Sequence, residues 1–364
     1  MVYKVIGLMS GSSLDGLDIV YTELHENGGN WSFEILASAC YPYDNDWKEA
    51  LKGATALNAL DYQLLHTAYG HYLGSQVNRF IEEHNLHYQV ALIASHGHTT
   101  FHLPAQKMTA QLGDGAALAA ATGLPVVSDL RALDVAFGGQ GAPIVPIGEK
   151  LLFRDYDLFL NIGGIANISF KKDGQWTAFD ICPANRVLNL LAAKHGKDHD
   201  PGGSLAALGQ VNEGLLQMLN ELEYYRKPAP KSLSNSFGTD EVYPLIRSFG
   251  LTHNDSLRTY VEHIVGQVTA ALALAPAGAE GPRKLLVTGG GALNTFLVDR
   301  LREAAAALQT EIVVADELIL NYKEALVMAL MGVLRWRQEY NTLSSATGAE
   351  RDSIGGAVWI GQEA

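Results

Sequence analysis

Cysteine is rare in this sequence, and its pattern suits neither a metal site nor a disulfide framework. Cys40 and Cys182 are the only two cysteines among 364 residues, and no CxxC or Cys/His finger spacing occurs. A disulfide framework or a zinc finger needs more cysteines at defined spacings. The simpler expectation is two reduced thiols in a cytoplasmic protein.

Long hydrophobic runs are missing as well. No apolar stretch approaches the roughly 20 residues that a membrane span requires. The N-terminal segment MVYKVIGLMSG lacks the apolar run and small-residue cleavage site of a secretory signal. We therefore expect a soluble, cytoplasmic protein without a membrane partner.

Positive charge is scarce, since 26 Lys and Arg stand against 39 Asp and Glu and the net charge is −13. A surface that follows a nucleic-acid backbone needs clustered cations, so nucleic acid is not an expected partner. A small phosphate ligand stays possible, because backbone amides can hold one without net positive charge. The hydrophobic share of 48% is ordinary for a globular protein, and this length suits two domains or one large one.

Several well-known signatures are not found. The sequence has no Walker A motif, no GxSxG elbow and no protein-kinase signature. His96, His98 and His102 lie close together, but no carboxylate or thiol beside them completes a metal site. A hydrogen-bonded or ligand-contacting loop is the better interpretation of these histidines.

Strands and helices alternate along the chain. Tyr3 to Met9 predicts a buried strand that enters the turn GSSLDGLD and a second strand, and a similar hairpin returns over Leu158 to Phe170. Leucine and valine at helical spacing predict packing helices over Leu208–Leu222 and Leu257–Leu272. Two hairpins in such an alternation indicate two related α/β domains, with the Gly/Pro-rich segment Phe137–Pro146 as the crossover.

The segment GLMSGSSLDGLD, Gly7 to Asp18, combines three glycines, three serines and two aspartates in one turn. Glycines let backbone N–H groups approach an anion, and serine hydroxyls add donors. Asp15 or Asp18 could hold Mg²⁺ with its water shell. An ordinary hairpin turn rich in small residues explains the segment equally well.

Two later glycine turns could also bring backbone N–H groups close to a ligand. Gly163–Gly164 interrupts an apolar strand, which indicates a bulge or a close backbone approach to a ligand. LLVTGGGALNTFL predicts a strand, a turn at Gly289–Gly291 and a helix, with Asn294 in place of the last glycine of a dinucleotide fingerprint. That arrangement offers backbone amides and a helix N-terminus to a nucleotide. A plain hairpin and a tight strand-to-helix turn are the structural alternatives.

Charged residues near the ends of strands form the remaining candidates. Asp129, Arg131 and Asp134 follow a predicted strand and suit recognition of hydroxyl and carboxylate groups, or else form a surface salt-bridge network. Asp180 lies between Phe179 and the pair Ile181–Cys182. Such a partly apolar setting raises the basicity of a carboxylate; the alternative is a helix N-cap.

In their order, these segments resemble the anhydro-N-acetylmuramic acid kinase family, within the actin, hexokinase and heat-shock-chaperone ATPase superfamily, over nearly the whole chain. Gly7 to Asp18 is similar to the family's GLMSGTSLDGID, with Ser12 in place of Thr. The likeness continues through SHGHTTFH, TAQLGDG, VVSDLRALDVAFGGQGAPIVP, NIGGIANIS, FDICPAN, APKS, GGGALN, KEAL and ATGA. It implies a two-domain actin/hexokinase-like (ribonuclease-H-like) α/β fold with a nucleotide-binding cleft between the domains. The expected domains are 1–145, completed by 325–364, and 146–324.

The resemblance also implies a reaction. ATP phosphorylates the 6-hydroxyl of 1,6-anhydro-N-acetylmuramic acid while water opens the anhydro ring, which gives N-acetylmuramic acid 6-phosphate in peptidoglycan recycling. Mg²⁺, a homodimer and opening and closing of the domains are expected with it.

The family's motifs match individual residues of this chain. Asp180 corresponds to the catalytic carboxylate, the general base for the water. Arg131 and Glu324 correspond to positions on the sugar side, and His96 and Asp129 are expected to bind substrate with them. Asp15 is the expected metal ligand. The residues expected to bind the nucleotide are Gly11, Ser12, Ser13, Leu14, Asp15, Gly16, Leu17, Asp18, Gly163, Gly164, Gly289, Gly290, Gly291 and Asn294.

The chain departs from the family at several positions. FDICPAN replaces FDTGPGN, Asn189 stands where Asp is usual, and LSNSFG after Lys231 lacks the usual Gly-Arg-Glu. Ala184 in place of Gly is harmless only where the backbone φ is negative. Because Asp180 is retained, we expect an active enzyme of a divergent branch. A non-catalytic sugar- or nucleotide-binding paralogue, a kinase for a related amino sugar and an actin-like assembly protein are the alternatives.

Overall fold

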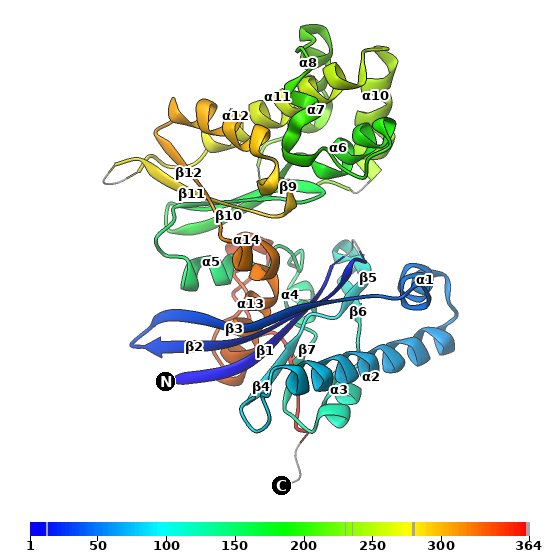
Figure 1. Cartoon of the computed structure of the whole chain (residues 1–364). Coiled ribbons are helices and arrows are strands. Elements are labelled where there is room, and N and C mark those ends of the chain that lie inside the picture. The colour runs from blue at the N-terminus through cyan, green and yellow to red at the C-terminus, as the bar shows by residue number, and fades with distance from the viewer. Residues whose placement is uncertain (12–13, 230, 235, 279–280, 362–364) are drawn as a thin grey trace. The chain divides into compact units, whose positions relative to one another are not determined.

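The computed structural model describes residues 1–361 except 12–13, 230, 235 and 279–280 (Figure 1). The chain divides into two compact units, one formed by residues 1–154 and 322–364 and the other by residues 155–321. The expected boundaries were at residues 145 and 324. No helix within the described part of the chain has the length and hydropathy needed to cross a bilayer.

The first unit contains a mixed six-stranded sheet in the order β13-β7-β4-β1-β2-β3. Its strands are β1 (Val2–Ser10), β2 (Gly16–Asn27), β3 (Asn30–Pro42), β4 (Leu92–Ser95), β7 (Val126–Ser128) and β13 (Ala357–Trp359), with β5 (His98–Leu103) and β6 (Met108–Leu112) in a separate pair. The first three strands are antiparallel, whereas β4 and β7 run parallel to β1. Its helices are α1 (Asn45–Gly53), α2 (Ala59–Glu83), α3 (Gly115–Thr122), α4 (Ala132–Ala136), α5 (Pro146–Leu152), α14 (Ser344–Thr347) and most of α13 (Glu317–Trp336).

The core of the first unit lies between this sheet and its helices. Leu73 and Phe80 of α2 are fully buried against Ile6 and Tyr21 of the sheet. On β1, a Cβ atom at Gly7 would collide with the main chain of α13 at Ala325. That close approach explains why a glycine interrupts an otherwise bulky strand.

The second unit repeats the same strand order on a five-stranded sheet, β10-β9-β8-β11-β12. Its strands are β8 (Leu158–Ile162), β9 (Ile165–Lys172), β10 (Gln175–Pro183), β11 (Arg283–Thr288) and β12 (Thr310–Val314). An antiparallel three-stranded meander is followed by two strands parallel to the first, as in the other unit. Each unit therefore has the ribonuclease-H-like order, and the predicted α/β class with a recurring hairpin is confirmed.

Helices cover one face of the second sheet (Figure 1). They are α6 (Asn185–Ala192), α7 (Ser204–Ala207), α8 (Glu213–Asn220), α9 (Glu223–Arg226), α10 (Tyr243–Ser248), α11 (His253–Leu272) and α12 (Thr295–Ala306). The expected helix over Leu257–Leu272 is α11, and its leucine and valine face is buried. The helix expected over Leu208–Leu222 is confirmed only in its second half, where α8 buries Leu215 and Leu219. It begins after the Asn212 cap and not at Leu208, which is 75% exposed.

Candidate active site

The predicted residues of the first unit lie at the carboxyl edge of its parallel strands. β1 ends at Ser10 before the first glycine turn, β4 ends just before His96, and β7 ends just before Asp129. The N–H of His96 donates to the carbonyl of Leu8 on β1 over 3.1 Å, which ties two of these segments together. Ligands of α/β sheets bind at this edge.

The first hairpin turn spans Gly11 to Asp15. Ser12 and Ser13 lie outside the described residues, so their predicted contacts stay predictions. Leu14 has a φ of +58°, which an L residue with a branched side chain rarely adopts. Asp15 follows with an exposed side chain.

Packing within the fold explains the next two residues of the motif, Gly16 and Leu17. A Cβ at Gly16 would come within 2.6 Å of the Tyr41 carbonyl on β3. Leu17 is buried in the core. Packing between β2 and β3 therefore accounts for both residues without a ligand.

Asp18 carries the most perturbed carboxyl group at this turn. It lies on β2 opposite Cys40 of β3, and burial raises its pKa to about 6. The negative charges of Glu324 and Asp15 contribute to the same shift. The described residues contain no group of three His, Cys, Asp or Glu side chains placed to hold a metal ion, so Asp15 as a metal ligand stays a prediction.

The side chains of His96 and Arg131 are joined by a hydrogen bond. Arg131 donates from Nε to His96 Nε2 over 2.8 Å and from Nη1 to the Gly141 carbonyl over 2.8 Å. His96 is buried, and its Nδ1 lies 2.8 Å from the Gly97 carbonyl. Because Nε2 must accept from Arg131, Nδ1 carries the proton and the ring is neutral. Burial and the Arg131 charge agree with this, since they lower the pKa of His96 to about 3.

The remaining acidic residues of this segment have separate partners. Asp129 is exposed, adopts a φ of +56° and accepts a hydrogen bond from Ser128 Oγ over 2.8 Å. Asp134 is buried and accepts from the Gly141 N–H and from Thr347 Oγ1. Within the described residues Arg131 is not bonded to either carboxylate, so the alternative of a surface salt-bridge network is wrong for this segment.

In the second unit, the Gly163–Gly164 turn lies against the start of α6. The carbonyl of Gly164 accepts from the Ala184 N–H over 2.8 Å, and that of Gly163 accepts from the Asn185 N–H over 3.0 Å. A Cβ at Gly163 would meet no atom closer than 3.5 Å, and one at Gly164 none closer than 3.8 Å. Steric crowding within the fold therefore does not require glycine at either position, and contact of this pair with a ligand stays a prediction.

The turn Gly289–Gly291 packs against the end of β8, beside the Gly163–Gly164 turn. Gly289 has a φ of +80°, and a Cβ at Gly291 would collide with the Ile162 side chain, so the fold requires both glycines. Gly290 differs, because the nearest atom to its Cβ would be Asn185 Nδ2 at 3.7 Å. The structure thus brings together three glycines at which a Cβ would meet only ordinary van der Waals contacts, Gly163, Gly164 and Gly290.

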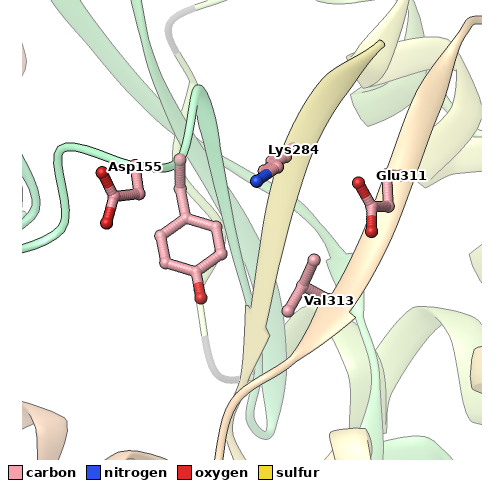
Figure 2. Close-up of a pocket in the computed structure, with 5 residues that line it drawn as sticks. Asp155, Lys284, Glu311 and Val313 are labelled. Carbon is pink, nitrogen blue, oxygen red and sulfur yellow. The ribbon is translucent and has the colours of Figure 1, made fainter.

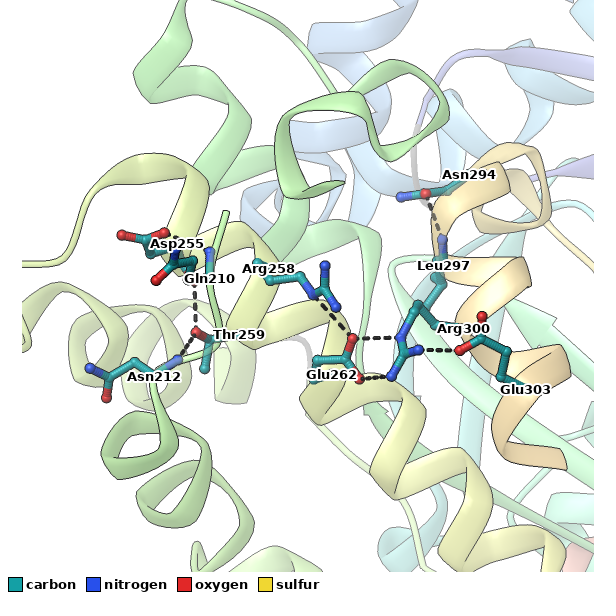
Figure 3. Close-up of polar contacts among 10 residues, drawn as sticks. All are labelled: Gln210, Asn212, Asp255, Arg258, Thr259, Glu262, Asn294, Leu297, Arg300 and Glu303. Atoms are coloured by element: carbon teal, nitrogen blue, oxygen red, sulfur yellow. Dashed lines mark hydrogen bonds and ion pairs between the residues drawn. The ribbon is translucent and has the colours of Figure 1, made fainter. Parts of the chain in front are cut away.

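Asn294 is explained by the helix that follows it. Its Oδ1 accepts a hydrogen bond from the Leu297 N–H over 3.0 Å and caps α12 (Figure 3). Side-chain capping is the usual role of Asn at this position. Contact of Asn294 with a nucleotide stays a prediction.

Asp180 lies near the end of β10, next to an irregularity in the ladder with β9. Its Oδ2 accepts from the Leu233 N–H over 2.8 Å, and its carbonyl accepts from Tyr224 Oη over 2.6 Å. Burial raises the pKa of Asp180, and the bond from Leu233 partly opposes that rise. The cap of α6 is Ala184, without a side-chain bond, so the alternative that Asp180 caps a helix is wrong.

The departures around Asp180 are accommodated by the backbone. Ala184 has a φ of −125°, so the replacement of Gly by Ala is free of strain there. Cys182 is fully buried, and burial raises the pKa of its thiol. That thiol is therefore unreactive.

Arg186, four residues after Cys182 and the second residue of α6, was not predicted from the sequence. Its Nε is buried without a hydrogen-bond partner. Its guanidinium lies beside Gly164, because Nε and Nη2 are 3.8 and 3.9 Å from where a Cβ on that glycine would stand. An arginine directly after the FDICPAN motif was the available signal, but its lack of a partner is visible only in the fold.

Two other polar features of the second unit lie away from these turns. Glu262 of α11 pairs with Arg258 at 3.2 Å and Arg300 at 2.7 Å (Figure 3), an ion-pair network between helices. A shallow pocket is lined by Asp155, Tyr156, Lys284, Glu311 and Val313 (Figure 2). Lys284 and Glu311 are neighbours in the ladder between β11 and β12, near the amino ends of both strands. That end of the sheet is opposite the edge that carries Gly289.

Known proteins are similar to this chain over nearly its whole length. A model of the anhydro-N-acetylmuramic acid kinase family matches residues 3–361. The anhydro-N-acetylmuramic acid kinase of Methylobacterium nodulans is 34% identical, covering 98% of this chain and 99% of its own, and that of Vibrio cholerae is 32% identical over 97% of each. Among solved structures, the activator of 2-hydroxyisocaproyl-CoA dehydratase from Clostridium difficile with bound ADPNP covers 93% of this chain and 96% of its own, at 15% identity and a TM-score of 0.46. With its family motifs matched over nearly its whole length, this chain belongs to the anhydro-N-acetylmuramic acid kinase family.

Proposed function

We propose that this protein uses ATP to phosphorylate 1,6-anhydro-N-acetylmuramic acid and opens the anhydro ring with water. The products are N-acetylmuramic acid 6-phosphate and ADP, and the process served is peptidoglycan recycling. Membership of the family supports the activity. The observation that carries the mechanism is Asp180, a half-buried carboxylate with a raised pKa and one oxygen, Oδ1, without a partner among the described residues.

Asp180 acts as the general base. Water attacks the anomeric carbon, the bond between that carbon and the bridging oxygen breaks, and the water proton passes to Asp180 Oδ1. The freed oxygen at position 6 takes the phosphoryl group. Because a base works best with a pKa closer to the working pH, the upward shift of the Asp180 pKa favours this role.

The residues that suit the nucleotide are the glycines that the fold does not require. Gly163, Gly164 and Gly290 leave their backbone uncovered in one place, which fits the close approach of phosphate oxygens. The first hairpin, Gly11 to Asp18, is the second proposed phosphate site, and Asp15 is the proposed Mg²⁺ ligand beside Asp18. Bound Mg²⁺ would neutralise charge on the phosphates.

The residues proposed for the sugar lie in the first unit. Arg131 suits the carboxylate of the sugar's lactyl group, since a guanidinium binds carboxylates through paired hydrogen bonds. His96 orients that guanidinium by accepting from Nε. Asp129 and Glu324 are exposed carboxylates that can accept from hydroxyl groups. A cytoplasmic homodimer is part of the proposal, and light scattering of the purified protein tests the oligomeric state.

One experiment tests the function directly. The protein is incubated with ATP, Mg²⁺ and the anhydro sugar in ¹⁸O-labelled water, and the products are analysed by mass spectrometry. We expect a phosphorylated reducing sugar with the label on the anomeric oxygen and none in the phosphate. Reactions without sugar, and with an amino sugar that has no anhydro bridge, serve as controls. Binding of both ligands without turnover would instead support the non-catalytic paralogue.

A further inference from the structure

Arg186 is a cation without a partner among the residues that the structure describes. Its Nε is buried with no hydrogen bond, and its guanidinium forms no ion pair, hydrogen bond or ring contact with any described residue. Other arginines of the same unit are satisfied: Arg283 donates to four carbonyls and a hydroxyl, and Arg300 pairs with two carboxylates. An unpaired buried donor lowers stability, so such a group in a native protein calls for a reason.

The surroundings of Arg186 point to an anion. The guanidinium lies beside Gly164, in the turn whose glycines the fold does not require. The N–H groups of Ala184, Asn185 and Arg186 all donate to the carbonyls of Gly163 and Gly164. These amides at the start of α6 are therefore already used, and an anion at this turn would need another donor. The Arg186 side chain is that donor.

We propose that Arg186 binds a phosphate group of the nucleotide at the Gly163–Gly164 turn. This inference rests on the proposed kinase function and adds a ligand-binding side chain to it. A planar guanidinium with free N–H groups matches phosphate oxygens in charge and in geometry. The residue is only half-buried, so the terminal nitrogens can reach a bound ligand while Nε stays within the protein.

The test measures the binding of ADP and of adenosine, by calorimetry, to the wild-type protein and to Arg186→Gln. We expect the ADP dissociation constant to rise by about tenfold or more, as for loss of a charged hydrogen bond, and the adenosine constant to change less than twofold. The dependence of ADP affinity on salt should also weaken, because one cationic contact is lost. Arg302→Gln on α12, an exposed arginine paired only with Asp299, is the matched control and should leave both constants unchanged.

Thermal unfolding without nucleotide separates ligand binding from a structural role. Because Arg186 has no partner to lose within the described part of the chain, Arg186→Gln should melt no lower than the wild type. An ADP affinity within twofold of the wild type would overturn the inference, and so would equal weakening of ADP and adenosine or a clear loss of thermal stability. If the wild type binds ADP through Arg186 but does not phosphorylate the sugar, the proposed function fails and this inference stands.

Discussion

The main-chain N–H of Leu233 holds one oxygen of Asp180, Oδ2, at 2.8 Å and leaves the other free of any described partner. The donor comes from a loop 53 residues further along the chain. A carboxylate fixed at one oxygen has a defined direction at the other, and a general base needs that geometry. The same bond partly opposes the rise in the pKa of Asp180 that burial causes.

The first prediction replaces Asp180 by Asn. An Asn side chain can still accept from the Leu233 N–H, so the loop should stay in place, but it cannot take a proton from water. We expect the turnover number to fall about 10²- to 10⁴-fold while ATP and the sugar still bind. Steady-state kinetics and calorimetry measure the two effects. Near wild-type turnover in Asp180→Asn would remove Asp180 from the mechanism.

A second prediction concerns Tyr224, whose hydroxyl donates to the Asp180 carbonyl over 2.6 Å. Tyr224→Phe removes this bond, so we expect a several-fold lower turnover number with little change in the ATP Michaelis constant, and a loss of about 1 kcal/mol in the free energy of unfolding. Tyr225→Phe is the matched control, because Tyr225 Oη contacts His263 at 3.0 Å instead. Equal kinetics in the two variants would mean that Tyr224 serves stability alone.

The glycine turns provide a third, paired prediction. Gly163→Ala has space for its new methyl group, so its melting temperature should stay within a few degrees of the wild type while ADP affinity falls. Gly291→Ala collides with Ile162, so it should lower stability by about 1–3 kcal/mol, as overpacking does. Thermal unfolding and ADP titration of both variants are the measurements. Unchanged ADP affinity in a well-folded Gly163→Ala would place the phosphates elsewhere.

The fourth prediction is a pH dependence that originates from Asp18, whose pKa is raised to about 6 by burial and by Glu324 and Asp15. Its pKa in the unfolded chain is near 3.9. The folded state therefore binds the proton more tightly, and the stability linked to this group is present below pH 4 and lost as the pH rises through 6.

Replacement of Asp18 by Asn removes that titration. In urea unfolding we expect Asp18→Asn to raise the free energy of unfolding at pH 7.5 by up to about 3 kcal/mol and to change it little at pH 4. Asp198→Asn, at an exposed loop position, is the control with no such gain. A variant that is less stable at pH 7.5 would show that the Asp18 charge stabilises the fold.

Local patterns in the sequence predicted the parts of the fold that depend on local spacing. The hairpins at both glycine turns and the buried face of α11 follow from strand and helix periodicity. The helix expected over Leu208–Leu222 begins later than predicted, at Glu213, and before it Gly209 packs closely against the distant main chain of Asn254. Periodicity carries no information on such a contact.

Some features of the candidate site were likewise predictable from the sequence, whereas others depend on contacts that only the fold creates. Motif order identified Asp180 and the glycine turns, since residue types and their order are properties of the sequence. Whether Asp180 caps a helix, and which atom holds His96, depend on partners 53 and 35 residues away. Arg186 was not predicted, because what distinguishes it is the lack of a partner among the described residues, which only the folded structure reveals.

The first unit is assembled from two stretches of chain, residues 1–154 and 322–364, with the whole second unit between them. During translation its N-terminal sheet emerges first, but β7 then lacks β13, and Gly7 lacks the α13 backbone that it packs against. At about 5–20 residues per second, that sheet waits on the order of ten seconds for its missing strand and helix. During that interval the ribosome-bound nascent chain exposes an unpaired strand edge and the apolar sheet face that α13 later covers. The second unit can complete its own fold before the first.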